Sequence, residues 1–236
     1  MVDFLVAENI NSYYGKSHIL FDVSFTVYEG EILCLMGRNG AGKSTTFKSI
    51  VMDVVPKKGK VYFKGQDITG MKMFKIARLG LGLVPEDRKI FGPLTVKENL
   101  ILGTAMGQGR KGIWNLALVY EFFPILKDFQ NREGGTLSGG EQQMLTIART
   151  LMGNPVVLLL DEPTEGLSPV MVKTLKDLIL KLKEVGTTIL LSEQNIKFAT
   201  AVSDRVAIID KGHIRYKADI ETFRKDDAIK KQYLSV

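Results

Sequence analysis

EILCLMGRNGAGKST, residues 31–45, contains the strongest indication of the fold in this sequence. Its first part, 31–36, is too uniformly apolar to alternate, as expected of a strand that is buried on both faces. Residues 37–44 match the pattern Gly-x4-Gly-Lys-Ser, and a helix is predicted from about Lys43. A buried strand, a glycine-rich turn and a helix in this order indicate a loop whose backbone N–H groups surround phosphate.

The phosphate loop, residues 37–45, carries the polar groups that a nucleoside triphosphate needs. Its backbone N–H groups would wrap the α- and β-phosphates, Lys43 would reach the β- and γ-phosphates, and the Ser44 hydroxyl would bind Mg²⁺. An incidental glycine turn is the alternative, and the flanking strand and helix argue against it. The residues predicted to bind nucleotide here are Gly37, Arg38, Asn39, Gly40, Ala41, Gly42, Lys43, Ser44 and Thr45.

Two carboxylates follow a second apolar strand in VVLLLDEP, residues 156–163. Asp161 is expected to hold Mg²⁺, through water, as in the general phosphate-loop scheme. Glu162 is its direct neighbour, so its side chain points another way and is free to orient or deprotonate an attacking water. Alone, such a pair would most simply face solvent. Together with the phosphate loop, it indicates a nucleoside triphosphatase.

The remaining patterns predict one domain, residues 1–236, with a largely parallel α/β sheet. Apolar strands are expected at 156–161 and 187–192, and between them Ser168-Pro169 opens a helix that ends at Gly186. Near the N-terminus, HILFDVSFTV (18–27) alternates, which places Ile19, Phe21, Val23, Phe25 and Val27 on one face.

A helical lobe is predicted within this core. Residues 86–153 contain helical patterns and little strand signal, whereas residues 1–85 and 154–236 form the catalytic lobe.

Composition excludes several classes of protein. The 236 residues contain no apolar run of the roughly 20 residues that a membrane helix needs, and the first residues do not resemble a secretory signal, so we expect a cytoplasmic chain. The single cysteine, Cys34, excludes an intrachain disulfide. The net charge is +6, but the basic residues are dispersed, which argues against nucleic-acid binding.

LSGGEQQMLTIART, residues 137–150, indicates a second anion site. Its apolar residues fall at helical spacing from Glu141 onward, yet the helix opens with paired glycines, which are poor helix formers. Glycine at a helix start lets a ligand approach the bare N–H groups, where the helix dipole attracts anions. We therefore predict a phosphate contact at Ser138, Gly139 and Gly140.

These motifs in this order resemble the ATP-binding cassette (ABC) family, and the resemblance covers essentially the whole chain. It implies an ABC-type phosphate-loop ATPase with a mainly parallel core sheet, an N-terminal antiparallel β part and an inserted helical lobe. In that family two ATPase subunits pack head to tail. The resemblance thus implies that Ser138, Gly139 and Gly140 contact the γ-phosphate of ATP bound by the partner subunit.

The resemblance also implies two further features. Tyr14 corresponds to the aromatic residue that stacks on adenine, with Tyr13 as the rival for that role and core packing as the third possibility. EGLSP, residues 165–169, occupies the position of the loop that crosses the dimer interface. Ser168 stands there in place of the family's aspartate, so the family's contacts across the interface do not carry over directly.

Two departures from the general pattern narrow the identification. Glu86 stands where the family has the glutamine of its glutamine loop, and it is predicted to act in catalysis and metal binding. Gln194 replaces the family's switch histidine; it can hydrogen-bond a γ-phosphate but cannot take up a proton. The sequences VPEDRKIF (84–91) and EQN (193–195) resemble the second ATPase subunit of bacterial branched-chain amino-acid importers, and urea and amide importers share much of this pattern.

The resemblance therefore implies an ATPase that uses ATP and Mg²⁺ to power an importer. The expected partners are a second ATPase subunit, identical or paralogous, and an integral membrane permease on whose cytoplasmic face the chain lies peripherally. A periplasmic binding protein would be an indirect partner. A lipid exporter and a non-transport ABC ATPase are the alternatives. Ile90, Phe91, Pro93 and Leu94 form an apolar cluster that either docks the permease or pins the two lobes together.

Overall fold

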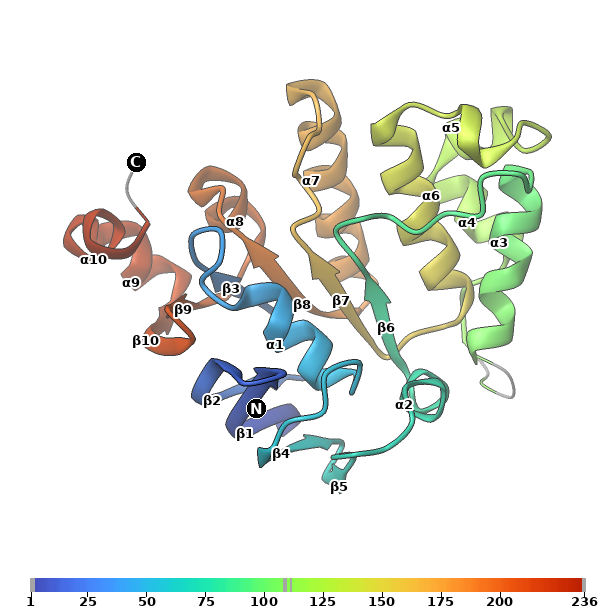
Figure 1. Ribbon diagram of the computed structural model, residues 1–236. Helices are drawn as coiled ribbons and strands as arrows, with labels where there is room; N and C mark the ends of the chain where they lie inside the picture. The colour runs from blue at the N-terminus through green and yellow to red at the C-terminus, as the bar shows by residue number, and fades with distance from the viewer. Residues whose placement is uncertain (1–2, 108–109, 111, 235–236) are drawn as a thin grey trace.

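The computed structural model in Figure 1 describes residues 3–107, 110 and 112–234. Within them the strands form two sheets, ordered β2-β1-β4-β5 and β10-β9-β3-β8-β7-β6. The strands are β1 (Asp3–Tyr14), β2 (Ser17–Tyr28), β3 (Ile32–Met36), β4 (Lys58–Phe63), β5 (Gln66–Asp67), β6 (Leu81–Val84), β7 (Val157–Asp161), β8 (Thr188–Glu193), β9 (Arg205–Asp210) and β10 (His213–Asp219).

Helices connect and cover these strands. The α-helices are α1 (Lys43–Ile50), α2 (Met73–Leu79), α3 (Val96–Thr104), α4 (Leu116–Phe122), α5 (Pro124–Asp128), α6 (Gly139–Met152), α7 (Pro169–Glu184), α8 (Ile196–Val202), α9 (Ile220–Lys225) and α10 (Asp227–Tyr233). Two 3₁₀ turns are η1 (Ala105–Gly107) and η2 (Gly134–Thr136). The helix predicted after Ser168-Pro169 is α7, where the Ser168 side chain accepts a hydrogen bond from the N–H of Met171.

The larger sheet is parallel from β6 to β9, and only β10 runs antiparallel to its neighbour β9. Every residue of β3, β7 and β8 is buried, as uniformly apolar strands require. Parallel strands bring their carboxyl ends to the same edge. The loops that follow β3, β7 and β8 therefore meet at one edge of the sheet, which places the phosphate loop beside Asp161 and Gln194.

Side-chain alternation in β3 divides the core into two layers. Leu33 and Leu35 join the apolar cluster under α1 and the antiparallel sheet. Ile32, Cys34 and Met36 join the cluster on the opposite face, which α6, α7 and α8 cover. The structure thus has an antiparallel sheet, a mainly parallel sheet and a helical layer, which confirms the predicted fold class.

A bulge in β2 corrects one sequence prediction. Ile10 pairs with Val23 whereas Ser12 pairs with Leu20, so β2 contains one extra residue. Asp22 lies there with a φ of 50°. The alternation changes face at this point: Leu20 is fully buried, whereas Ile19 and Phe21 are only half-buried. The prediction that Ile19, Phe21 and Val23 share one face is therefore wrong.

The described part of residues 86–153 contains helices and turns, with one isolated bridge between Thr95 and Glu133. The stretch GIWNLALVYEFFPIL (112–126) has a single helical pattern in the sequence, but the structure divides it into α4 and α5 at Pro124, because proline cannot continue a hydrogen-bonded helix. One apolar cluster runs without a break from β3 through α6 to α3. The separation of this segment as a lobe stays a prediction.

Candidate functional site

The phosphate loop connects β3 to α1, and its backbone requires glycine at two positions. A Cβ on Gly37 would lie 2.4 Å from the carbonyl oxygen of Ile209, closer than any side chain tolerates. Gly42 has a φ of 112°, in the left-handed region, and caps α1 without a side-chain hydrogen bond. The first N–H groups of α1 therefore remain available to an anion. Arg38, Asn39 and Gly40 are exposed, whereas Ala41 and Thr45 are buried.

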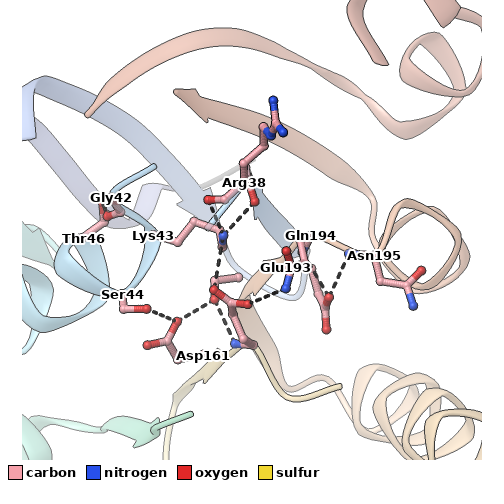
Figure 2. A network of polar contacts seen from close by, with 12 residues as sticks. Arg38, Gly42, Lys43, Ser44, Thr46, Asp161, Glu193, Gln194 and Asn195 are labelled. Carbon is pink, nitrogen blue, oxygen red and sulfur yellow. Dashed lines mark hydrogen bonds and ion pairs between the residues drawn. The ribbon is translucent and has the colours of Figure 1, made fainter. Parts of the chain in front are cut away.

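Lys43 is buried and folds back over this loop (Figure 2). Its Nζ donates to the carbonyl oxygens of Gly37 and Arg38 at 2.7 and 2.9 Å. It also lies 3.2 Å from Oε1 of Glu162. The ammonium group thus joins the loop after β3 to the carboxylate after β7.

Asp161 lies between two hydroxyl groups at the end of β7. Ser44 Oγ donates to its Oδ1 at 3.2 Å, and Ser192 Oγ donates to the same oxygen at 2.6 Å. Burial is the main cause that raises the pKa of Asp161, and the two hydrogen bonds oppose that rise. A buried carboxylate that needs a counter-charge, beside a serine hydroxyl, is a donor set that fits Mg²⁺.

Glu162 turns away from Asp161 because its own backbone has a φ of 44°. Its N–H donates to Ser192 Oγ at 2.9 Å, which anchors this left-handed turn to β8. Its carboxylate is held at both oxygens, by Lys43 and by the Gln194 Nε2 donor at 3.2 Å. The structure therefore brings Lys43, Glu162 and Gln194 together.

Two further carboxylates in this region were missed by sequence reasoning. Glu193 is buried at the end of β8 and accepts a 2.7 Å hydrogen bond from Thr164 Oγ1. The Glu165 carboxyl lies against that of Glu162. A hydrogen bond between these two side chains is the main cause that raises the pKa of Glu165. The available signal for Glu193 was its position as a charged residue at the end of an apolar strand. Glu165 begins the EGLSP loop, but no local signal in the sequence predicts its contact with Glu162.

Glu86 follows β6 and is exposed. Its charge contributes to the raised pKa values of Asp161 and Glu165, so it lies within electrostatic reach of both. Within the described residues, Glu86 makes no hydrogen bond to Ser44 or Asp161. Its predicted metal-binding role is therefore a proposal without a direct contact in support.

The two candidate adenine-stacking residues differ in their surroundings. Tyr13 stacks on His18 with ring centroids 4.0 Å apart, and the Lys57 ammonium lies 4.4 Å from its ring centroid. Tyr14 is 47% exposed at the β1–β2 turn. A ring whose faces are already used cannot receive adenine, so these contacts favour Tyr14.

Ser138, Gly139 and Gly140 form the N-terminus of α6 and lie apart from the phosphate loop of their own chain. Ser138 and Glu141 make a capping box, in which Glu141 Oε2 accepts from the Ser138 N–H at 2.7 Å. Among the described residues, no hydrogen bond or ion pair joins this segment to residues 37–45. Figure 1 shows α6 among the helices of the 86–153 segment, away from α1.

Across residues 3–107, 110 and 112–234, no helix combines the length and apolar character of a membrane span.

Comparison with known proteins identifies close relatives. The family model described as "ABC transporter" matches residues 20–165. A high-affinity branched-chain amino acid transport ATP-binding protein of Pseudomonas aeruginosa is 39% identical over 88% of this chain and 89% of its own length. A probable branched-chain amino acid transport ATP-binding protein of Archaeoglobus fulgidus is 34% identical over 96% and 97%. A lipopolysaccharide export system ATP-binding protein of Haemophilus influenzae is 34% identical over 99% and 98%.

Solved structures agree with this relationship. A nucleotide-free ATP-binding cassette from an ABC transporter aligns with a TM-score of 0.85 and 26% identity over 99% of this chain and 98% of the other. A dimeric post-hydrolysis cassette bound to ADP and Pi aligns with a TM-score of 0.80 and 25% identity over 92% and 99%.

Proposed function

Because the chain belongs to the ABC transporter family and is an ATP-hydrolysing transporter subunit, we propose that it powers the import of branched-chain amino acids. The 39% identical importer subunit supports this solute. So do Glu86 and Gln194, which stand at the two positions where the importer branch departs from the general family pattern. The lipopolysaccharide exporter subunit is nearly as similar, which makes a lipid exporter the second candidate. Urea and amide importers remain alternatives within the importer class.

Nucleotide binding follows from the loop geometry. The free N–H groups of α1 and the buried Lys43 ammonium give the phosphates a positively charged cradle, while exposed Tyr14 offers a ring face to adenine. Ser44 and Asp161 would hold Mg²⁺, with Glu86 as a further acidic group nearby. The ion, when bound, offsets phosphate charge and polarises the γ-phosphate.

The single observation that carries the catalytic proposal is the placement of Glu162. Its carboxylate lies between Lys43, which would bind the γ-phosphate, and Gln194, which would hydrogen-bond the same group. A base at this position can accept a proton from water as the water attacks the γ-phosphorus. Gln194 is an amide, so it orients groups but takes up no proton.

The second half of the proposed nucleotide site comes from another subunit. ABC ATPase subunits dimerise, and a structurally similar cassette is a dimer in a post-hydrolysis state with ADP and Pi. In this chain the N–H groups of Gly139 and Gly140 belong to the first turn of α6 and have no intrahelical acceptor. We assign them, with Ser138, to the γ-phosphate bound by the partner subunit, so that ATP closes the dimer and hydrolysis reopens it.

ABC ATPase subunits also work with membrane permeases, and an exposed aromatic residue supports a docking surface here. Phe91 is 50% exposed, whereas its neighbour Ile90 packs against the main core. Ile90 thus pins the segment to the core. The Arg149 guanidinium lies 5.1 Å from the centre of the Phe91 ring, and the exposed half of that side chain would meet a permease helix at the cytoplasmic face of the membrane. A solute-binding protein would act only on the far side of the permease.

Two measurements test this function. Glu162→Gln should reduce ATP turnover by at least about 100-fold and retain ATP binding, because an amide cannot accept the proton. Glu184→Gln, the same change at the exposed end of α7, is the matched control and should leave turnover unchanged. Near-normal turnover in Glu162→Gln would contradict the assignment of the base.

The solute is tested separately, in vesicles that contain the chain with its own permease. ATP-dependent uptake of leucine supports the importer. Extraction of lipid without leucine uptake would instead establish the exporter.

A further inference from the structure

Arg88 lies in the segment between β6 and α3, and its backbone is pinned to α6. Its φ is 61° and that of Lys89 is 44°, so two successive non-glycine residues adopt the left-handed conformation. The carbonyl oxygen of Arg88 accepts from Thr146 Oγ1 at 2.8 Å, and that of Lys89 accepts from Arg149 Nη2 at 2.8 Å. These bonds from α6 hold the segment in a fixed position relative to that helix.

The guanidinium group of Arg88 lies where three loops meet. Its Nη1 is only 2.7 Å from the position that a Cβ on Gly139 would occupy, so it rests directly on the first residue of α6. Its Nη2 donates to the carbonyl oxygen of Glu165 at 3.4 Å and lies 3.6 Å from the corresponding position on Gly166. Among the described residues, no carboxylate forms an ion pair with it. The half-buried charge therefore has unused donors.

We propose that Arg88 acts in trans: its guanidinium binds, beside Ser138 and Gly139, the γ-phosphate of the ATP held by the partner subunit's phosphate loop. This inference rests on the proposed head-to-tail dimer. An arginine offers several donors in a planar fork that matches phosphate oxygens. The group also counterbalances the Glu141 carboxylate, which caps the same helix end and would otherwise repel an anion.

The chemistry predicts a selective effect on triphosphate. ADP lacks the γ-phosphate, so its binding to the phosphate loop should not depend on Arg88. Arg88→Gln keeps a donor for the Glu165 carbonyl but removes the charge. It should lower kcat/KM for ATP roughly 10- to 100-fold, the range expected for a charged hydrogen bond. Arg88→Lys should recover part of this loss, because it restores charge without the fork.

Lys89→Gln is the matched control, since it removes an equal charge from the adjacent and exposed side chain. It should leave kcat/KM and ADP affinity unchanged. Wild-type kcat/KM in Arg88→Gln, or an equal loss of ADP and ATP binding, would overturn the proposal.

Mixed dimers decide between action in trans and action in cis. A pair of one Lys43→Ala chain and one Arg88→Gln chain contains two composite sites. If Arg88 acts in trans, one site joins an intact phosphate loop to an intact Arg88, and the other site carries both defects. The mixture should then hydrolyse ATP faster than either variant alone. If Arg88 acts on its own chain's nucleotide, each site carries one defect, and no activity returns.

A second mixture separates this inference from the proposed function. Lys43→Ala combined with Ser138→Arg should regain activity through the same head-to-tail logic. Recovery in this pair without recovery in the Arg88 pair overturns the role of Arg88 and leaves the dimer proposal standing. Failure of both pairs overturns head-to-tail capping, and the trans role of Arg88 with it.

Discussion

The buried ion pair between Lys43 and Glu162 can be tested by a double-mutant cycle. The two groups lie 3.2 Å apart, with side chains 2% and 7% exposed. Removing one partner of such a pair leaves an uncompensated charge and costs about 3 kcal/mol. Lys43→Met also removes the donor for two backbone carbonyl groups. We therefore expect Lys43→Met to lower the free energy of unfolding by about 3 kcal/mol or more.

Glu162→Gln should lower the free energy of unfolding by less, about 1 kcal/mol. In this variant Lys43 keeps both carbonyl acceptors, and the new amide can still accept a hydrogen bond from Gln194. The double variant leaves no isolated charge, so its loss should fall below the sum of the single losses by about 2 kcal/mol. Denaturant titration without nucleotide measures all four unfolding free energies. The exposed pair Asp87–Lys89 is the control and should show no measurable coupling.

Additivity of the two single losses within about 0.5 kcal/mol would refute the ion pair in the nucleotide-free state. ATP provides a second readout. At about 100 times its Kd, ATP should stabilise the wild-type chain by about 2.7 kcal/mol, and Lys43→Met should lose this stabilisation. Stabilisation of Lys43→Met equal to that of the wild-type chain would show that Lys43 does not bind the phosphates.

Four other predictions concern the Mg²⁺ site, the phosphate loop, the adenine contact and the docking surface. Burial raises the pKa of Asp161, and binding of Mg²⁺ requires the ionised carboxylate. The Mg²⁺ concentration for half-maximal turnover should therefore rise as pH falls, and this rise should begin at a pH above the usual pKa range of aspartate. Ser192→Ala removes a bond that lowers this pKa and should move the effect to higher pH; an unmoved profile would contradict it. Gly37→Ala should weaken ATP binding at least about tenfold in a fluorescence titration, because its Cβ collides with backbone; unchanged affinity would refute the steric argument. Tyr14→Ala should weaken ATP binding by about 1 kcal/mol, whereas Tyr14→Phe should leave it unchanged. Unchanged ATP binding in Tyr14→Ala would show that the ring does not stack on adenine. Phe91→Asp should keep ATPase activity but abolish transport in vesicles, whereas loss of the fold would show that Phe91 holds the two parts of the chain together.

Local signals in the sequence were sufficient to predict much of the fold. The apolar run before the phosphate loop predicted β3, and Ser168-Pro169 predicted the start of α7, because both depend on neighbouring residues alone. The bulge in β2 escaped prediction. Its extra residue at Asp22 is accommodated by pairing with β1, which periodicity does not register.

Some residues of the candidate site could likewise be predicted from the sequence, whereas some of its contacts could not. Residue types and spacing indicated Lys43, Ser44 and Asp161, since the chemistry of phosphate and Mg²⁺ limits which groups can serve. The contacts of Ser192 with Asp161 and of Glu165 with Glu162 had no sequence signal, because they arise from adjacent parallel strands and a turned backbone.

Consecutive residues were enough to predict the strand, the glycine loop, the helix and the acidic strand end, because each follows from the size, polarity and backbone freedom of neighbouring residues. The contacts of Lys43 with Glu162 and of Arg88 with Gly139 became visible in the folded chain alone. Those contacts join segments far apart in the chain. Their partners are selected by sheet order and helix packing, which no short window of sequence contains.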